Sequence, residues 1–156
     1  MKEAIANVKK ITLDEAKGIP LIDTCAFIHH FDHHEKIELL KKEDFVITSF
    51  NFKELLFIEH KLSEKIKESI NKYLKKEKII VVEINVNPGN VEEEKKYVNS
   101  IEPDILHIIH DPSDAVLYAT ALEIGSDIIT RDKHHIYTQA AEKFGNKYGI
   151  SIRNKF

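Results

Sequence analysis

The sequence predicts an α/β fold, a three-layer α/β/α sandwich around a central parallel sheet of about five strands. Two observations predict it. Short, nearly continuous apolar runs rich in β-branched residues recur along the chain, as is typical of strands covered on both faces. Segments with helical spacing of apolar residues lie between these runs, and strands that alternate with helices form a parallel sheet.

The predicted strands share high β-branched content and short length. They are 19–23 (IPLID), 45–48 (FVIT), 79–84 (IIVVEI), 127–130 (DIIT) and 150–153 (ISIR). In a parallel sheet the crossovers are right-handed and every strand points its carboxyl end in the same direction. Ligands of such sheets bind beyond those carboxyl ends.

The predicted helices lie between the strands, at 50–62, 63–76, 91–100, 112–124 and 133–144. Ser63 is suited to cap the start of the second of these helices. Asp111 and Pro112 favour a helix start at 112, because aspartate caps and proline suits the first helical position. Gly145 is suited to end the last helix.

The chain of 156 residues favours one domain, predicted at 19–156, preceded by a polar N-terminal extension at 1–18 with a helical stretch ending at Gly18. No apolar run approaches the roughly 20 residues needed to cross a bilayer. The single cysteine, Cys25, allows no internal disulfide, which fits a cytoplasmic protein. The net charge of −3 is not that of a protein that holds nucleic acid by bulk positive charge.

Four acidic residues from distant parts of the chain converge on one edge of the predicted sheet. Asp23 ends the first strand and Asp132 follows the fourth strand by two residues, so both project at the carboxyl edge. Asp114 lies in the first turn of the helix 112–124. Glu54 lies early in the helix that follows the second strand.

Clustered carboxylates repel one another, so some of them must hold protons unless a counter-charge is present. Mg²⁺ or Mn²⁺ resolves this conflict, because both ions prefer oxygen ligands. Such an ion can activate water and stabilise the charge on a phosphate. Glycosidases also use carboxylates, but they need a pair rather than four.

Three segments resemble motifs of the PIN-domain family. LIDTCAFI (21–28) resembles the opening motif, an aspartate followed by Thr or Ser at the end of the first strand. DAVLYATALEIGSDIITRD (114–132) resembles the most recognisable segment of the family, and FKELLF (52–57) fits the helix that carries the glutamate. The resemblance spans about residues 19–153 and includes the order and spacing of the motifs.

The resemblance implies a metal-dependent nuclease of the small, VapC-like kind, many of which are toxins of type II toxin–antitoxin pairs. It assigns the catalytic and metal-binding acidic site to Asp23, Glu54, Asp114 and Asp132. The hydroxyls of Thr24 and Thr130 would orient the carboxylates of this site. The expected reaction is endonucleolytic cleavage of RNA, in which a metal-activated water attacks the phosphodiester in line and leaves a 5′-phosphate.

Beside the acidic site, Arg131, Lys133 and His134 are candidates for contacts with the RNA substrate. His134 stands where some family members carry a fifth acid, so the number of metal ions stays open. His135 is a further candidate for substrate contact.

Other acidic residues have alternative interpretations. Glu59 is a rival to Glu54 on the same predicted helix. Asp111 is interpreted as a helix cap, and Asp127 as a structural residue before the fourth strand.

The run HHFDHH places His29 with His33, and His30 with His34, at a spacing that could bind Zn²⁺ on one helix face. No cysteine pair or HExxH motif accompanies these histidines. A partly exposed surface near the mouth of the site is the favoured interpretation.

Two other functions compete with the ribonuclease. The first is a non-catalytic PIN-like module that binds RNA or a protein, since fold does not fix function. The second is a metal-dependent phosphohydrolase of the HD type, suggested by His110 and Asp111 but opposed by the strand signals. The expected partners are RNA, an antitoxin protein and a second copy of the chain, with no membrane, and 85–110 is a candidate contact segment.

Overall fold

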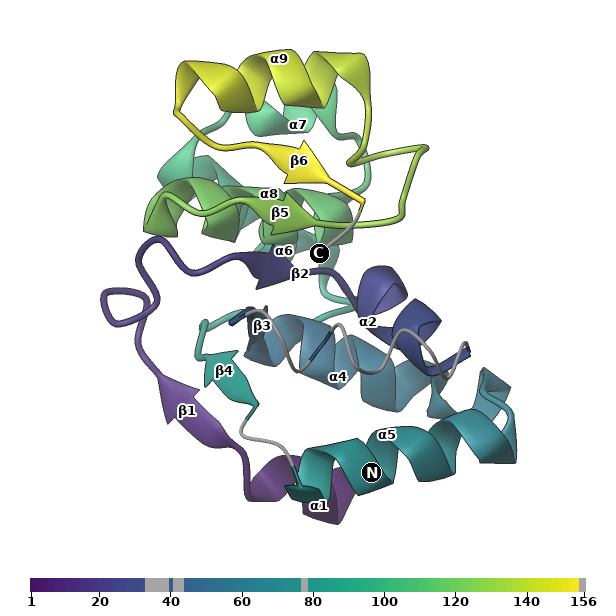
Figure 1. The fold of residues 1–156 in the computed structure, drawn as a ribbon. Helices are drawn as coiled ribbons and strands as arrows, with labels where there is room; N and C mark the ends of the chain where they lie inside the picture. Colours follow the sequence, from purple (N-terminus) through teal and green to yellow (C-terminus); the bar gives the residue numbers. More distant parts are fainter. Residues whose placement is uncertain (33–39, 41–43, 77–78, 155–156) are drawn as a thin grey trace.

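The computed structural model describes residues 1–32, 40, 44–76 and 79–154. In these residues six strands form one sheet, and every neighbouring pair is parallel, in the order β1-β4-β3-β2-β5-β6. The strands are β1 Lys9–Ile11, β2 Leu21–Ile22, β3 Val46–Thr48, β4 Ile80–Val82, β5 Ile128–Ile129 and β6 Ile152–Arg153. Figure 1 shows them following one another from β6 near the C-terminus to β1 near the N-terminus.

Helices connect and cover these strands. They are α1 Lys2–Ala6, α2 Thr24–Asp32, α4 Ser49–Ile58, the 3-10 helix η1 Glu59–Lys61, α5 Glu64–Lys76, α6 Val91–Ile101, α7 Ile105–Ile108, α8 Pro112–Ile124 and α9 Gln139–Lys147. In the described part of the chain, no helix combines the length and the apolar character that crossing a bilayer requires.

The sheet separates two apolar cores, because successive residues of a strand point to opposite faces. On one face Leu21 and Ile128 pack in a cluster with side chains from α6, α7, α8 and α9. On the other face Ile22 and Ile129 pack with side chains from α1, α2, α4 and α5. The predicted three-layer α/β/α architecture with a central parallel sheet is therefore confirmed.

The sheet has one strand more than the five predicted. Each predicted run contains an observed strand, and the additional strand, β1, lies within the polar stretch 1–18. Lys9 and Lys10 are exposed and only Ile11 reaches the core, so the strand lacks the apolar run by which the others were recognised. The helix in this stretch ends at Ala6 instead of continuing to Gly18.

The last helix begins later than predicted, at Gln139 instead of 133, and Gly145 lies within it instead of ending it. Thr138 caps the start, because its side chain accepts a hydrogen bond from the amide of Ala141. Close packing leaves no room for a side chain at position 145: a Cβ there would lie 2.8 Å from the hydroxyl oxygen of Tyr118 and 3.0 Å from Ile150 Cγ1.

Candidate active site

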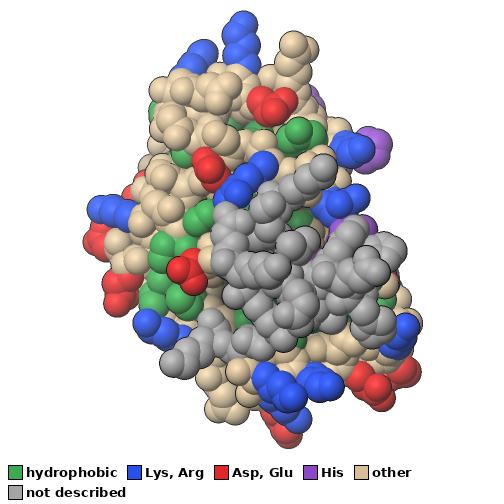
Figure 2. All heavy atoms as spheres, viewed as in Figure 1, with side chains coloured by type: hydrophobic (Ala, Val, Ile, Leu, Met, Phe, Trp, Pro, Cys, Tyr) green, Lys and Arg blue, Asp and Glu red, His purple; other side chains and the backbone are tan. Residues whose placement is uncertain are grey.

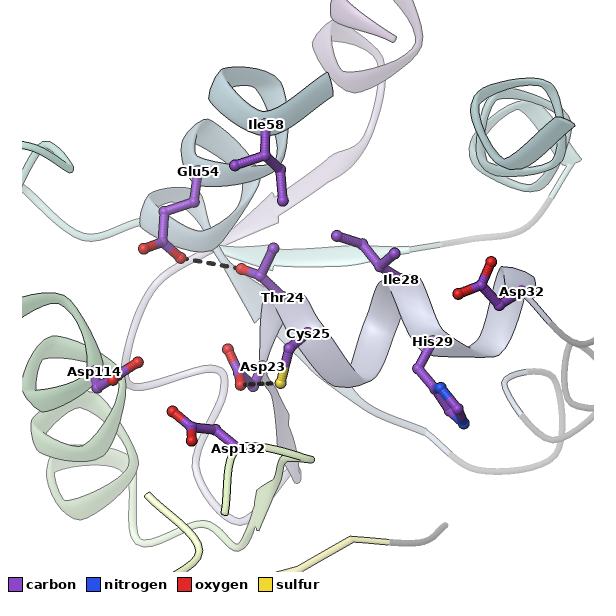
Figure 3. Close-up of a pocket in the computed structure, with 10 residues that line it drawn as sticks. All are labelled: Asp23, Thr24, Cys25, Ile28, His29, Asp32, Glu54, Ile58, Asp114 and Asp132. Carbon is purple, nitrogen blue, oxygen red and sulfur yellow. Dashed lines mark hydrogen bonds between the residues drawn. The ribbon is translucent and has the colours of Figure 1, made fainter. Parts of the chain in front are cut away.

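The carboxyl edge of the sheet opens into a cavity of about 630 Å³ that contains all four predicted acidic residues. The residues that line it are Asp23, Thr24, Cys25, Ile28, His29, Asp32, Glu54, Ile58, Asp114 and Asp132. In Figure 3 the carboxylates of Asp23, Asp114 and Asp132 face a common space, with Glu54 beside them, and α2 extends along the other side of the cavity.

Asp23 lies between β2 and α2 and is buried, with 6% of its surface exposed. Its Oδ2 accepts hydrogen bonds from the hydroxyl of Thr130, at 2.8 Å, and from the thiol of Cys25. Desolvation by burial raises the pKa of Asp23 above its usual value, although these two donors and the Thr24 amide lower it. Burial also raises the pKa of Cys25 to about 12, and the negative charge of Asp23 adds to this effect.

Asp132 is joined to Asp23 through one side chain. The hydroxyl of Thr130 donates to Asp23 Oδ2 and accepts a hydrogen bond from the amide of Asp132, at 3.0 Å. Asp132 Oδ1 in turn accepts the amides of His134 and His135, at 2.7 and 3.2 Å. These amides fix Oδ1 in the turn after β5, and Oδ2 lies on the side of Asp114 and His135.

Glu54 lies on α4, where a buried polar network holds its side chain. Glu54 Oε2 accepts hydrogen bonds from the hydroxyl of Thr24 and from Asn51 Nδ2, both at 3.0 Å. Burial raises the pKa of Glu54 to about 7, against these two hydrogen bonds and with a contribution from the charges of Asp23 and Asp114. The rival Glu59 lies in η1 with Oε1 3.7 Å from the terminal amine of Met1, and it does not line the cavity.

Asp114 lies in the first turn of α8, as predicted. The helix begins at Pro112, and Asp111 caps it by accepting hydrogen bonds from the amides of Ser113 and Asp114, which confirms the predicted cap. Desolvation raises the pKa of Asp114 to about 7, and the charges of Asp111, Asp23 and Asp132 raise it further while His135 lowers it.

His135 completes the acidic cluster, although the sequence suggested no more than substrate contact for it. Its Nδ1 lies 2.8 Å from Asp114 Oδ2 and 3.3 Å from Asp132 Oδ2. Desolvation opposes protonation of this half-exposed ring, but the charges of Asp114 and Asp132 outweigh it and raise the pKa of His135.

The donor atoms at this edge fit a divalent cation. One oxygen each from Asp114 and Asp132 and one nitrogen of His135 lie within 4.8 Å of one another. Burial, together with repulsion between the carboxylates, raises the pKa values of Asp23, Glu54 and Asp114, so a nearby cation would favour their ionised forms. Oxygen ligands with this need for a counter-charge are typical of Mg²⁺ and Mn²⁺ sites.

The three predicted substrate contacts lie within two residues of Asp132 in the sequence. Arg131, Lys133 and His134 are all exposed, and none of them is among the residues that line it. On the face drawn in Figure 2, the coloured Lys and Arg side chains are interspersed with Asp and Glu and do not form a single basic surface.

The histidines of the HHFDHH run separate in their environments. His29 lines the cavity on α2, whereas His30 is buried and its Nδ1 contacts the carbonyl of Ala26 one turn earlier. His33 and His34, which would complete the proposed Zn²⁺ pairs, lie outside the described residues.

Asn51 was not singled out from the sequence. It is buried, its Nδ2 donates to Glu54 Oε2 and to the hydroxyl of Thr24, and its Oδ1 accepts from the hydroxyl of Thr48. Its position three residues before Glu54 on one helix was the available signal, since residues at this spacing share a face.

A parallel α/β/α fold with carboxylates gathered at the carboxyl edge of the sheet agrees with a PIN-like protein. The sequence matches the PIN domain family over residues 21–142, which is most of the chain. The chain therefore belongs to the PIN domain family, whose members are generally nucleases that typically use divalent metal ions.

Solved structures with this fold include two bacterial proteins. One is VapBC2 from Rickettsia felis, in a crystal structure bound to a promoter DNA fragment. Its comparison with this chain gives a TM-score of 0.56 and 13% identity and covers 86% of this chain and 97% of that chain. FitAcB from Neisseria gonorrhoeae has a TM-score of 0.50 and 17% identity, with 87% of this chain and 97% of that chain covered. At these identities the likeness shows the fold. A comparison with curated protein sequences found no match.

Proposed function

We propose that this chain is a metal-dependent endoribonuclease that hydrolyses RNA phosphodiester bonds. The observation that carries the proposal is the gathering of Asp23, Glu54, Asp114 and Asp132 around one cavity at the carboxyl edge of the sheet. Membership of a family of nucleases supports it. The parallel sheet also excludes the all-helical HD-type phosphohydrolase.

In this proposal Asp23, Asp114 and Asp132 hold Mg²⁺ or Mn²⁺, with Glu54 beside them. Held by these carboxylates, such an ion would supply Lewis-acid chemistry that favours ionisation of water and offsets the charge of the phosphate. Thr130 holds the carboxylate of Asp23 in place, and Thr24 holds that of Glu54, so that both are fixed before the substrate binds.

We propose that Glu54 also accepts a proton from the attacking water. Its carboxylate lines the same cavity as the three aspartates, and burial, which raises its pKa in the metal-free protein, makes it a stronger base than an exposed glutamate. Both hydrogen bonds from Thr24 and Asn51 go to Oε2, so Oε1 is the oxygen assigned to this proton.

Cleavage of labelled RNA in Mn²⁺ or Mg²⁺ tests the proposal. Asp23→Asn and Asp114→Asn should each lower the cleavage rate by on the order of a hundredfold or more, because each removes one charge from the site. Asp127→Asn is the matched control, since Asp127 accepts a hydrogen bond from the amide of Ser151 and does not line the cavity. Equal rates in all four proteins would reject the proposal.

Metal binding separates this function from a non-catalytic PIN-like module. A divalent ion that binds the native state should raise the melting temperature, since any ligand of the folded state stabilises it. The rise should disappear in Asp114→Asn. Absence of any rise in the wild type would favour the non-catalytic module.

We further propose that the protein acts as the toxin of a type II toxin–antitoxin pair and forms a homodimer in the cytoplasm. The VapC-like resemblance supports the role, and the neighbours VapBC2 and FitAcB share the fold. Expression of this chain by itself should arrest the growth of the host cells. Co-expression of a short reading frame from directly upstream of its gene should relieve the arrest. Light scattering after gel filtration measures the oligomeric state. Substitutions within the candidate contact segment 85–110 should be tested first for an effect on it.

A further inference from the structure

His135 lies close enough to the carboxylates of Asp114 and Asp132 to share a cation with them. Its Nδ1 is 2.8 Å from Asp114 Oδ2 and 3.3 Å from Asp132 Oδ2. One donor atom from each of the three residues lies within 4.8 Å of the other two. A metal ion bonded to all three atoms would therefore need only small adjustments of these side chains.

The backbone of the turn presents the imidazole to the site. Asp132 Oδ1 accepts the amides of His134 and His135, and the amide of Tyr137 donates to the carbonyl of Asp132 at 2.7 Å. Directly after His135, the side chain of Ile136 is fully buried in the core. Although the ring itself is half exposed, its backbone is fixed on both sides.

The amides of His134 and His135 bond to only one of the two carboxylate oxygens of Asp132. Oδ1 accepts the backbone amides, while Oδ2 lies 3.3 Å from His135 Nδ1. A carboxylate held in this way keeps its other oxygen in a fixed direction. Hydrogen bonds commonly orient metal-binding side chains in this manner.

We infer that His135 is a nitrogen ligand of the divalent ion held by Asp114 and Asp132, and that this site prefers Mn²⁺ to Mg²⁺. Mg²⁺ binds oxygen and tolerates little deviation from its octahedral geometry. Imidazole nitrogen favours the transition ions, whose affinities for mixed nitrogen and oxygen sites exceed that of Mg²⁺. The inference rests on the proposed metal-dependent function and adds to it the kind of ion that the site selects.

Calorimetric titration of the full chain with Mn²⁺ and with Mg²⁺ tests this ligand without any measurement of cleavage. His135→Gln should weaken Mn²⁺ binding on the order of tenfold and Mg²⁺ binding much less, because it removes a nitrogen donor. His135→Asp, which makes the three donors all oxygen, should move the preference toward Mg²⁺. His107→Gln is the matched control, an exposed histidine on α7 that does not line the cavity, and it should bind both ions as the wild type does.

Pulsed electron paramagnetic resonance of bound Mn²⁺ identifies the nitrogen directly. Hyperfine coupling to imidazole nitrogen should be present in the wild type and in His107→Gln, and absent in His135→Gln. Mn²⁺ binding that is lost in Asp114→Asn but keeps its affinity and its spectrum in His135→Gln would overturn the inference and leave the nuclease proposal standing. A wild-type protein that binds neither ion would overturn both.

Discussion

At the scale of single residues, the hydroxyl of Thr130 connects two acidic side chains that are remote in the sequence. It donates to Asp23 Oδ2 and accepts the amide of Asp132. Asp23 is buried, so a lost donor there is not replaced by bulk water. One hydroxyl therefore sets the positions of both residues.

Thr130→Val should lower the free energy of unfolding by about 1–3 kcal/mol, because it leaves buried polar groups unpaired. The variant should also cleave RNA more slowly than the wild type under conditions in which both proteins are fully folded. Thr120→Val is the matched control, since Thr120 is equally buried and donates to the carbonyl of Val116 within α8. Urea unfolding and initial cleavage rates of both variants measure the difference, and equal cleavage by the two would contradict the role of Thr130.

The pKa of Glu54 predicts how the stability of the metal-free protein depends on pH. Burial raises this pKa from 4.5 to about 7. Between these values the folded state binds more protons than the unfolded state, so the free energy of unfolding falls as pH rises from about 4.5 to about 7. Asp114, with a pKa also raised to about 7, contributes with the same sign.

Glu54→Gln should flatten this dependence and make the metal-free protein more stable than the wild type near neutral pH. Urea unfolding in the presence of a chelator, from roughly pH 4 to pH 8, measures the effect. Glu59→Gln is a matched control on the adjacent η1, outside the cavity. Parallel pH curves for the wild type and Glu54→Gln would show that Glu54 has an ordinary pKa.

Some of these residues are placed by the sequence pattern, and others only by the folded structure. Asp23 and Asp132 could be placed because they follow strands, and strand ends of a parallel sheet meet at one edge. Asn51 and His135 could not be placed in the same way. Their contacts depend on side-chain directions and on the turn after β5, which no periodic pattern encodes.

At the scale of elements, the start of α8 determines where Asp114 lies. Asp111 accepts two amides of the first turn, and Pro112 occupies the first helical position. Successive residues of a helix are turned by about 100°, so a displaced start would point Asp114 away from the cavity.

Asp111→Ala should lower the free energy of unfolding by about 0.5–2 kcal/mol and reduce RNA cleavage, because the helix loses its cap. Asp111→Ser should retain most of the stability, since serine can accept the same amides. Asn90→Ala, which removes the cap of α6, should cost similar stability but leave cleavage unchanged. Full cleavage by Asp111→Ala, measured beside its unfolding curve, would show that the cap does not position Asp114.

The elements that were predicted well have strong local signals. Helix α8 agrees with its prediction at both ends: aspartate and proline mark its start, and in the structure Gly125 ends it in a left-handed conformation. Helix α9 begins later than predicted, because the amides of His134 and His135 bond to Asp132 in a turn that precedes the helix. Strand β1 was missed because two of its three residues are exposed lysines.

At the scale of the whole molecule, the N-terminal residues widen the sheet. β1 pairs with β4 along its full length, and α1 packs on α5. Ala4 and Ile11 each contribute to one of the two cores. Residues 1–11 are thus in contact with both faces of the domain.

Removal of residues 1–11 should lower the free energy of unfolding and promote association, because it exposes apolar surface and the unpaired edge of β4. Removal of residues 1–7, which leaves β1 in place, should have a smaller effect and serves as the comparison. Urea unfolding and light scattering measure both. Unchanged stability in the shorter chain would support 19–156 as a domain that needs no N-terminal extension.

The order of the strands also indicates where local opening of the sheet is expected. β2, which leads into Asp23, has β5 and β6 on one side and β3, β4 and β1 on the other. Local opening of a protein begins where contacts are fewest, which in a sheet is at its outermost strands. The central position of β2 therefore places Asp23 beside the part of the sheet that is expected to open least.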